Sequence, residues 1–357
     1  MTTLNEIVNT ILKISKMLGD VVEEDKVDTS EDVKEGCINV EYVDNIVDKI
    51  EKPRDLKKFW GLDASIRTLK LTGIDIIIVS GALVGSRLYI EPKIIDTRWI
   101  CIRPRCKASE DLKQLLENLS YKFYTKSRLV DRVFDGTYSE EVLQDELRVS
   151  MENSMIKLWD RTGILIIDGP LFHAPRIISS IDNIYAKVYI ELTKERLNLL
   201  KGFEDKVVCI VKRLSQCRYL ARLECVGATD DYVAIIKANK ILKRREVSSV
   251  FIGTLRLSIS VQDYEFEKYM GYIVSRAGDV FNVIRIETLD LEFLYDIKDY
   301  IAQILTPSGV PKTIELADKL CKKVSSSIFT ILWNIAPLSP TYEGFESLLL
   351  SLKDLQE

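Results

Sequence analysis

Apolar residues near the N-terminus recur every three or four positions, at Leu4, Ile7, Ile11, Ile14 and Leu18. This spacing predicts an amphipathic helix over residues 4–18. Residues 21–36 are rich in Glu, Asp and Lys and poor in apolar side chains, which indicates a charged connector. We expect a second short helix over residues 40–58.

Three β-like runs then follow in quick succession, at about 58–64, 66–72 and 74–84. Their short connections imply antiparallel hairpins. After them, apolar runs of strand length alternate with helical patterns. We expect strands at 163–168, 206–212, 249–261, 269–276 and 279–287, and helices at 109–120, 139–160, 174–202, 214–224, 230–245, 290–305 and 311–333.

The order β-β-β-α-β-α-β-α predicts an α/β fold of the RNase H-like kind. In that fold, three antiparallel strands are followed by two strands that are entered through helical crossovers. We take residues 1–57 as an N-terminal region, 58–335 as the main domain and 336–357 as a tail. Residues 214–290 are an α+β insertion before the last helix.

The length, composition and net charge of the chain narrow the class of protein to which it can belong. Its 357 residues suit one large α/β domain with insertions, and 46% apolar with 29% charged residues is ordinary for a soluble protein. The net charge of −4 excludes a uniformly basic nucleic-acid binder, so phosphate contacts would need a local patch. No apolar run reaches the roughly 20 residues of a membrane span, and no signal peptide is visible. These features predict a cytoplasmic protein without a membrane partner.

Several common kinds of site are excluded by residue counts and spacing. The only histidine, His173, rules out sites built on several imidazoles, and we expect it to be a packing or surface residue rather than a helper beside a metal. The seven cysteines are expected to be reduced thiols, because Cys101 and Cys106 have no second pair at zinc spacing. Neither a Walker A loop nor a G-x-G-x-x-G sequence occurs.

Acidic side chains give the strongest chemical signal. Asp63 follows the run Phe59–Leu62, and Asp168 ends the run Ile164–Ile167. In the predicted topology these strands are neighbours, so their carboxylates would approach each other, with Glu152 from the intervening helix and Asp318 from the last helix. Clustered carboxylates suit Mn²⁺ or Mg²⁺. Two such ions about 3.5–4 Å apart can activate water and stabilise the leaving oxygen in phosphodiester hydrolysis.

Each acid also has a structural explanation when it is taken alone. Asp63 before Ala-Ser could accept hydrogen bonds in an Asx turn, Asp168-Gly169-Pro170 could be an ordinary turn, and Glu152 could be a solvated helix residue. The joint pattern favours the metal site.

Basic residues near the second crossover are candidates for phosphate contacts. Lys212 and Arg213 end a buried strand, and Arg218 and Arg222 follow at helical spacing. A solubilising surface is the alternative for the last two and for the basic helix face Lys237–Arg245. The apolar faces of residues 1–18 and 345–352 could serve assembly or local packing.

Three motifs carry a family resemblance. They are Leu62-Asp63-Ala64-Ser65 followed by Arg67, Leu147-Arg148-x-x-x-Glu152, and Ile167-Asp168-Gly169-Pro170-Leu171. With further matches at 207–212, 283–287 and 309–318, the chain resembles the NurA family of archaeal DNA-repair nucleases from about residue 58 to 330. The family usually has Gly at the place of Ala64, Tyr at that of Val310 and His at that of Asp318.

The resemblance implies a manganese-dependent, RNase H-like nuclease that acts on DNA ends in double-strand break repair. It also implies a homodimer with a central DNA channel that docks on a HerA-type hexameric ATPase. Asp63, Glu152, Asp168 and Asp318 would hold the metal, and Arg67, Lys212, Arg213 and Arg218 would contact DNA. The three departures leave a second hypothesis open, a catalytically degenerate scaffold that stimulates a DNA translocase. An enzyme acting on RNA is a third.

Overall fold

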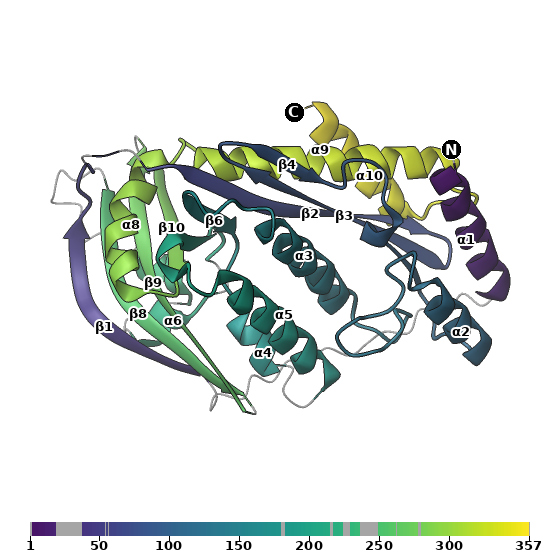
Figure 1. Ribbon diagram of the computed structural model, residues 1–357, viewed down its shortest axis with the longest axis horizontal. Coiled ribbons are helices and arrows are strands. Elements are labelled where there is room, and N and C mark those ends of the chain that lie inside the picture. The colour runs from purple at the N-terminus through teal and green to yellow at the C-terminus, as the bar shows by residue number, and fades with distance from the viewer. Residues whose placement is uncertain are drawn as a thin grey trace.

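A ten-stranded mixed sheet organises the protein, flanked by helices on both faces (Figure 1). The computed structural model describes residues 2–18, 38–53, 55, 57–179, 183–214, 217–223, 229–235, 249–261, 263–277 and 280–356. The predicted connector 21–36 and the basic residues Lys237–Arg245 lie outside these ranges.

Six strands form the centre of the sheet. β2 (Phe59–Leu71) pairs antiparallel with β3 (Ile74–Val84), and β3 pairs with β4 (Leu88–Glu91) and β5 (Ile100–Pro104). On the other side of β2, β6 (Ile164–Asp168) and β7 (Val207–Val211) run parallel to it. The predicted α/β class is therefore confirmed, and the strand order agrees with the RNase H-like expectation.

The sheet continues beyond β7 through antiparallel strands. These are β10 (Val280–Thr288), β9 (Tyr264–Ala277), β8 (Ser249–Val261) and β1 (Ile38–Lys49). The strands of the predicted insertion thus extend the same sheet. The expected helix over residues 40–58 is wrong, because β1 pairs with β8 and packs Ile38, Val40 and Tyr42 on the core at the two-residue period of a strand.

Two strand predictions near residue 60 also need correction. The expected runs 58–64 and 66–72 form one strand, β2, in which Asp63 pairs with Ala82 and Ser65 with Ser80. Asp63 is therefore a mid-strand residue and the Asx-turn alternative is wrong, although its Oδ1 does accept from the Ala64 N–H at 2.8 Å. The further antiparallel strands, β4 and β5, come from residues that carried no prediction.

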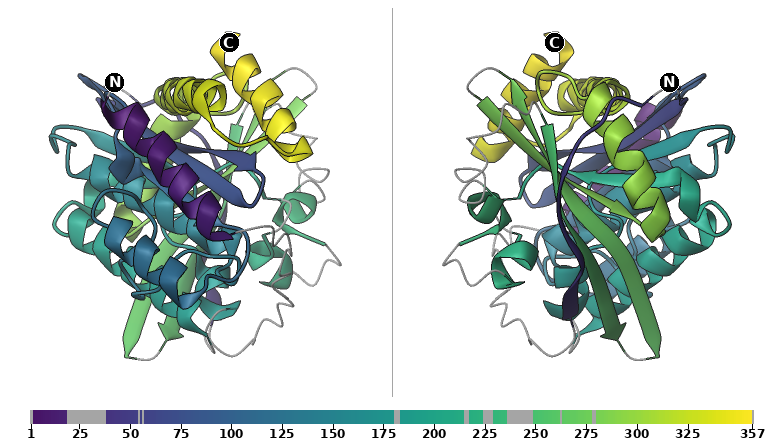
Figure 2. Two further views of the ribbon diagram at one scale, coloured as in Figure 1. Left: turned by 90° about the vertical axis from the view of Figure 1, so that its right-hand side faces the viewer. Right: turned by 90° about the vertical axis from the view of Figure 1, so that its left-hand side faces the viewer.

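Helices cover the two faces of the sheet differently (Figure 2). α3 (Glu140–Ile156), α4 (Ala174–Ser179), α5 (Ile184–Leu200) and α6 (Tyr219–Leu223) contribute to the largest core cluster. α8 (Leu291–Ile304) and the start of α9 (Lys312–Ile335) pack against the opposite face of β6 and β7. The end of α9 meets α1 (Thr2–Leu18) and α2 (Glu110–Leu119) in a separate cluster.

Capping side chains fix where several helices begin. Ser109, Ser139, Asn183 and Asp290 each accept a backbone N–H from the first turn of α2, α3, α5 and α8. Two 3₁₀ turns, η2 (Thr97–Trp99) and η3 (Glu204–Lys206), lead into β5 and β7. The tail forms α10 (Tyr342–Gln356), which lies on α9 and β2. None of the helices in the described ranges combines the length and apolarity needed to cross a bilayer.

Candidate active site

The register of β2 and β6 brings Asp63 and Asp168 to the same level of the sheet. Leu62 pairs with Ile167 in this parallel pair, so each acid is the next residue of its strand. Leu62 and Ile167 belong to the core beneath α3 and α5, and side chains alternate along a strand. Both carboxylates therefore project on the opposite face, the one covered by α9.

Gly61 of β2 lets α9 approach that face, because glycine has no side chain. A Cβ at Gly61 would lie only 2.5 Å from the backbone carbon of Thr313, in the first turn of α9. This close approach sets Asp318, about one turn further along, near the acids of β2 and β6. Glycine at position 61, two residues before Asp63, therefore allows α9 to pack closely on β2.

The pKa of Asp63 records the proximity of all four acids. Its side chain is buried, and burial raises the pKa well above 3.8, with further increases from the negative charges of Asp168, Asp318 and Glu152. Asp63 is therefore within electrostatic reach of acids on β6, α9 and α3, although α3 covers the other face of the sheet.

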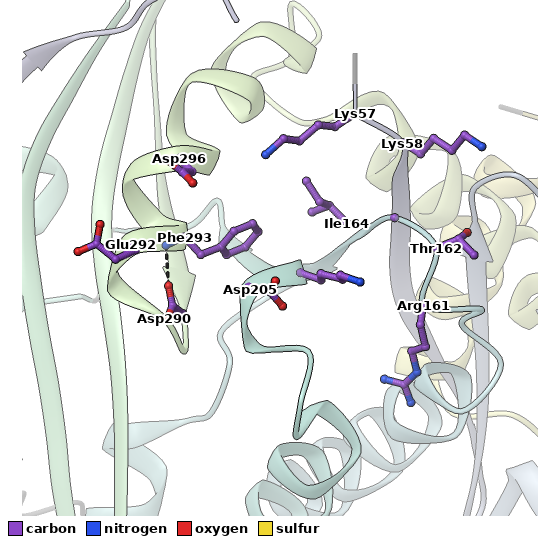
Figure 3. Close-up of a pocket in the computed structure, with 12 residues that line it drawn as sticks. Lys57, Lys58, Arg161, Thr162, Ile164, Asp205, Asp290, Glu292, Phe293 and Asp296 are labelled. Atoms are coloured by element: carbon purple, nitrogen blue, oxygen red, sulfur yellow. Dashed lines mark hydrogen bonds between the residues drawn. The ribbon is translucent and has the colours of Figure 1, made fainter. Parts of the chain in front are cut away.

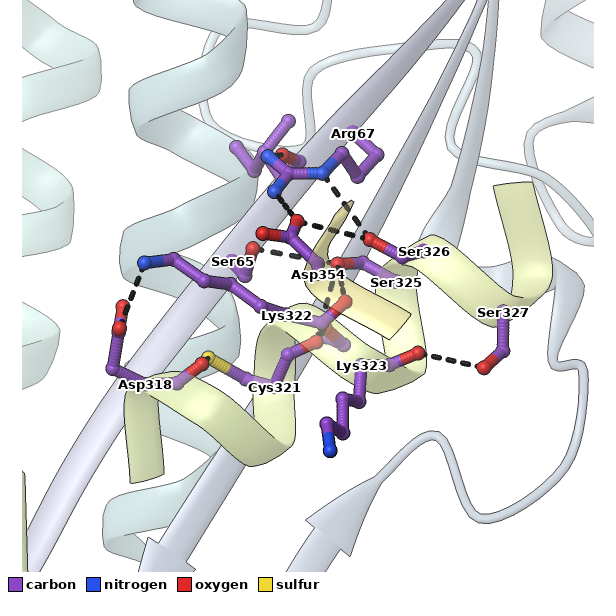
Figure 4. A network of polar contacts seen from close by, with 12 residues as sticks. Ser65, Arg67, Asp318, Cys321, Lys322, Lys323, Ser325, Ser326, Ser327 and Asp354 are labelled. Carbon is purple, nitrogen blue, oxygen red and sulfur yellow. Dashed lines mark hydrogen bonds and ion pairs between the residues drawn. The ribbon is translucent and has the colours of Figure 1, made fainter. Parts of the chain in front are cut away.

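Three of these acids are each paired with a cation. Lys212 Nζ lies 2.6 Å from Asp168 Oδ2, Lys322 Nζ lies 2.7 Å from Asp318 Oδ2 (Figure 4), and Arg196 of α5 donates to Glu152 Oε2. Burial raises the pKa of Asp168 despite the attraction of Lys212. Burial acts to lower the pKa of Lys212, but Asp168, Asp63 and Asp318 raise it above 10.5. Lys212 therefore stays charged beside the acids.

Glu152 has one carboxylate oxygen without a partner among the residues that the structure describes. Its side chain is only 3% exposed, and while Oε2 pairs with Arg196, Oε1 has no hydrogen bond within those ranges. A buried acceptor left unpaired costs about 1–3 kcal/mol. An acceptor of this kind suits a cation or a donor from a bound molecule.

The acids do not form a preassembled metal site. Within the described ranges, no three His, Cys, Asp or Glu side chains converge closely enough to hold an ion. The donors nevertheless fit a hard divalent cation, because all four are carboxylates and one buried oxygen is vacant. In this structure Lys212, Lys322 and Arg196 neutralise three of them instead.

Arg148 is a site residue to which the sequence gave no role. Loss of hydration acts to lower the pKa of this α3 guanidinium, but the negative charges of Glu152, Asp145, Asp63 and Asp168 outweigh it and raise the pKa above its usual value. Its Nη2 lies 3.2 Å from His173 Nε2, and burial followed by Arg148 lowers the pKa of His173 well below 6.5. The signal available in the sequence was the four-residue step from Arg148 to Glu152, which places both on one helical face.

The predicted DNA-binding residues lie in different surroundings. Lys212 is half-buried among the acids, whereas Arg213 and Arg218 are exposed at the surface. Arg67 lies on the same face of β2 as Asp63, but its guanidinium pairs with Asp354 of α10 and its Nε lies 3.4 Å from Ser326 Oγ (Figure 4). The structure therefore brings only Lys212 into contact with the acids.

A cleft of about 510 Å³ lies at the other end of β2 and β6, where these two strands begin (Figure 3). Four cationic and four acidic side chains line it, among them Lys57, Arg161, Asp290 and Asp296. This balance of charge favours no class of ligand.

Comparison with known proteins gives one family. The model described as the NurA domain matches residues 57–322. The crystal structure of the NurA nuclease from Sulfolobus solfataricus is 13% identical, with a TM-score of 0.42, over 94% of this chain and 97% of that one. A structure of NurA bound to dAMP and manganese is 11% identical, with a TM-score of 0.43, over 76% and 86%. No curated protein matches the chain.

Proposed function

The chain belongs to the NurA family, and from this premise we propose that it is a metal-dependent nuclease that hydrolyses phosphodiester bonds in DNA. The observation that carries the proposal is the shared electrostatic environment of Asp63, Asp168, Asp318 and Glu152. Acids on four separate elements gain nothing for the fold by repelling one another, so their placement within electrostatic reach of Asp63 favours a site for a cation that would draw them together.

Mn²⁺, or Mg²⁺ in its place, is the cofactor we propose. Asp63, Glu152, Asp168 and Asp318 would hold it, with the vacant Oε1 of Glu152 among the donors. Manganese is present in two solved NurA structures, one of which also contains dAMP. When bound, such an ion supplies an activated water and stabilises the charge that develops on the leaving oxygen.

Basic residues of the chain then take the role of binding and orienting DNA. Lys212 neutralises Asp168 in the structure, and once a cation takes over that carboxylate, the ammonium group is free to contact a phosphate. Arg148 is held beside the same acids by Asp145 and His173, which keeps a second positive charge near the substrate. Arg67, Arg213 and Arg218 would contact the DNA backbone further from the reaction.

The assembly that we propose is a homodimer that works with a HerA-type hexameric ATPase on the ends of double-strand breaks. An exonuclease that also cleaves single strands internally fits that task. The support comes from family membership and from the RNase H-like order of the central strands.

A catalytically degenerate scaffold is the second candidate, and one observation favours it. Lys212, Lys322 and Arg196 already neutralise three of the four acids, which is what a site without metal would need. Such a protein would bind a DNA translocase and stimulate it without cutting DNA.

Manganese-dependent degradation of end-labelled single-stranded DNA separates the two candidates. The enzyme requires cleavage by the parent protein, loss of cleavage in Asp63→Ala with the fold intact, and normal cleavage by Glu315→Gln, an acid of α9 that forms an ion pair with Lys319. No cleavage by the parent, together with increased ATPase activity of a HerA-type partner, would establish the scaffold. Undiminished cleavage by folded Asp63→Ala would refute the role of Asp63.

A further inference from the structure

Buried charged side chains hold the turn that follows Asp168. The turn, residues Gly169–Phe172, leaves β6 with Gly169 at a φ of 99°, a conformation that favours glycine. The Gly169 N–H donates to the Ile210 carbonyl at 2.8 Å, which keeps the start of the turn on β7. Side chains from other elements bind the Leu171 N–H and the carbonyls of Pro170, Leu171 and Phe172.

Glu287 of β10 and Lys268 of β9 bind the middle of the turn. The Leu171 N–H donates to Glu287 Oε2 at 2.8 Å. Lys268 Nζ donates to the same carboxylate oxygen at 2.7 Å and to the Phe172 carbonyl at 3.1 Å. The two side chains are 0% and 1% exposed, so water does not compete for these contacts.

Arg196 of α5 links the turn to the helix that carries Glu152. Its Nη1 lies 3.4 Å from the Pro170 carbonyl and 3.5 Å from the Leu171 carbonyl, while its Nη2 pairs with Glu152. The turn after Asp168 and the carboxylate of Glu152 are therefore fastened to one guanidinium.

Holding the turn with these contacts costs free energy, because charged side chains lose their hydration when they are buried. A buried ion pair is often no better for stability than apolar side chains of the same size, because both charges lose their hydration. Such pairs are informative where they fix a geometry. Here Lys268 and Glu287 bind the backbone of the turn that directly follows Asp168. The direction of the Asp168 carboxylate decides whether it can share a cation with Asp63.

We propose that Lys268 and Glu287 are positioning residues that fix the Gly169–Phe172 turn, hold Asp168 in the direction that a metal requires, and so set the affinity of the protein for Mn²⁺. The inference rests on the proposed function. It adds residues that touch neither metal nor DNA and that act through the backbone of the turn.

Lys268→Met is the informative variant. It removes the donor to Glu287 and Phe172 but leaves Glu287 paired with Arg285, whose Nε lies 2.9 Å from Oε1. We expect Mn²⁺ binding, measured by calorimetry on the folded protein without DNA, to weaken about 10- to 100-fold, which is typical of losing a residue behind a metal ligand. Hydrogen exchange of the Leu171 amide should become faster. Lys268→Arg, which keeps a charged donor, should restore most of the affinity.

The matched control is Arg103→Met. Arg103 forms a buried ion pair with Asp75 at 3.1 Å, between β5 and β3, in another part of the sheet. We expect this variant to lower the unfolding temperature without changing Mn²⁺ affinity. If Lys268→Met does not fold, Lys268→Gln carries the same test, because its amide keeps one donor in place of the ammonium group.

The outcomes separate this inference from the proposed function. A parent protein that binds Mn²⁺ and cleaves DNA, with a Lys268 variant of unchanged Mn²⁺ affinity, overturns the positioning role alone, even if that variant is less stable. A parent that neither binds Mn²⁺ nor cleaves DNA removes the proposed function and this inference with it.

Discussion

Lys212 Nζ lies 2.6 Å from Asp168 Oδ2, at the end of two adjacent parallel strands. The residue pairing sets Asp168 against Ile210, so Lys212 is only two positions beyond, directly after β7 ends at Val211. A charged ammonium group thus neutralises the acid at which we propose a metal binds. Binding of a cation there must displace the lysine from Asp168, and the displaced lysine remains within reach of a substrate phosphate.

Lys212→Met tests that exchange. We expect the variant to lose about 100- to 1,000-fold in the rate of cleavage at saturating Mn²⁺, as is typical when one positive group that stabilises developing charge is removed. Mn²⁺ affinity should not weaken, since the ion no longer competes with the ammonium group. Lys206→Met, at the opposite end of β7, is the control and should cleave normally. Equal rates for the two variants would contradict the role of Lys212.

Asp63→Asn should make the protein more stable while it abolishes cleavage. Burial and three neighbouring acids raise the pKa of Asp63 well above 3.8, so the charged form opposes folding. The amide can still accept the hydrogen bond from the Ala64 N–H. A gain of 1 kcal/mol corresponds to about 1–2 °C in unfolding temperature for a chain of this size. A lower unfolding temperature in metal-free buffer would count against the repulsion.

The advantage of Asp63→Asn should depend on pH in a defined direction. An acid whose pKa is raised by folding favours the folded state when it is protonated, below its unfolded value of about 3.8. That contribution is lost as the pH rises through the folded pKa. The stability difference between variant and parent should therefore grow from pH 4 to pH 8 and be small at pH 4. Urea unfolding at several pH values measures it, and a difference that shrinks with rising pH would contradict it.

Gly61→Ala should separate α9 from the acids of β2. The added Cβ would lie 2.5 Å from the backbone of Thr313, which cannot move aside as a side chain can. We expect a loss of about 1–3 kcal/mol in stability from overpacking and a lower rate of cleavage, because Asp318 moves with the helix. Gly81→Ala on the neighbouring strand meets only the flexible side chains of Met151 and Met155 and should lose less activity. Similar activity in both variants would argue against the close approach at Gly61.

Asp354→Ala should strengthen DNA binding if Arg67 contacts a phosphate. The structure neutralises Arg67 with Asp354, so removing the acid frees the guanidinium. We expect the slope of log affinity against log salt to steepen by about 0.7–0.9, the value for one additional phosphate contact. The double variant Arg67→Met/Asp354→Ala should lose this gain. A gain that persists in the double variant would assign it to charge removal at Asp354 alone.

Most of the central fold could be predicted because its signals are local. Buried apolar runs mark β6 and β7, and three-to-four spacing marks α3, α8 and α9. The four acids could also be named, since Asp63 follows a short buried apolar run, Asp168 ends a strand, and Glu152 and Asp318 lie on helices. The charges of the other three raise the pKa of Asp63, while the roles of all four as metal ligands stay proposals.

The two wrong secondary-structure predictions, the helix over 40–58 and the break within β2, have the same cause. Contacts between segments that are distant in the sequence decided both structures. β1 looked helical because its strand period becomes meaningful only when β8, about 200 positions later, lies beside it. Asp63-Ala64-Ser65 looked like a turn because small and polar residues favour turns locally, whereas pairing with β3 on one side keeps the strand continuous.

By itself, the sequence determined the α/β class, the order of the central strands and the family to which the chain belongs. Tertiary structure alone decided which charges meet: Lys212 with Asp168, Asp354 with Arg67, and Lys268 with Glu287 behind the turn. Hydrophobic periodicity and turn preferences depend on residues that are close in the sequence, so they can be recognised within one segment. The pairing of a charged side chain is set by which distant element packs against it, and only the assembled sheet and its helices fix that choice.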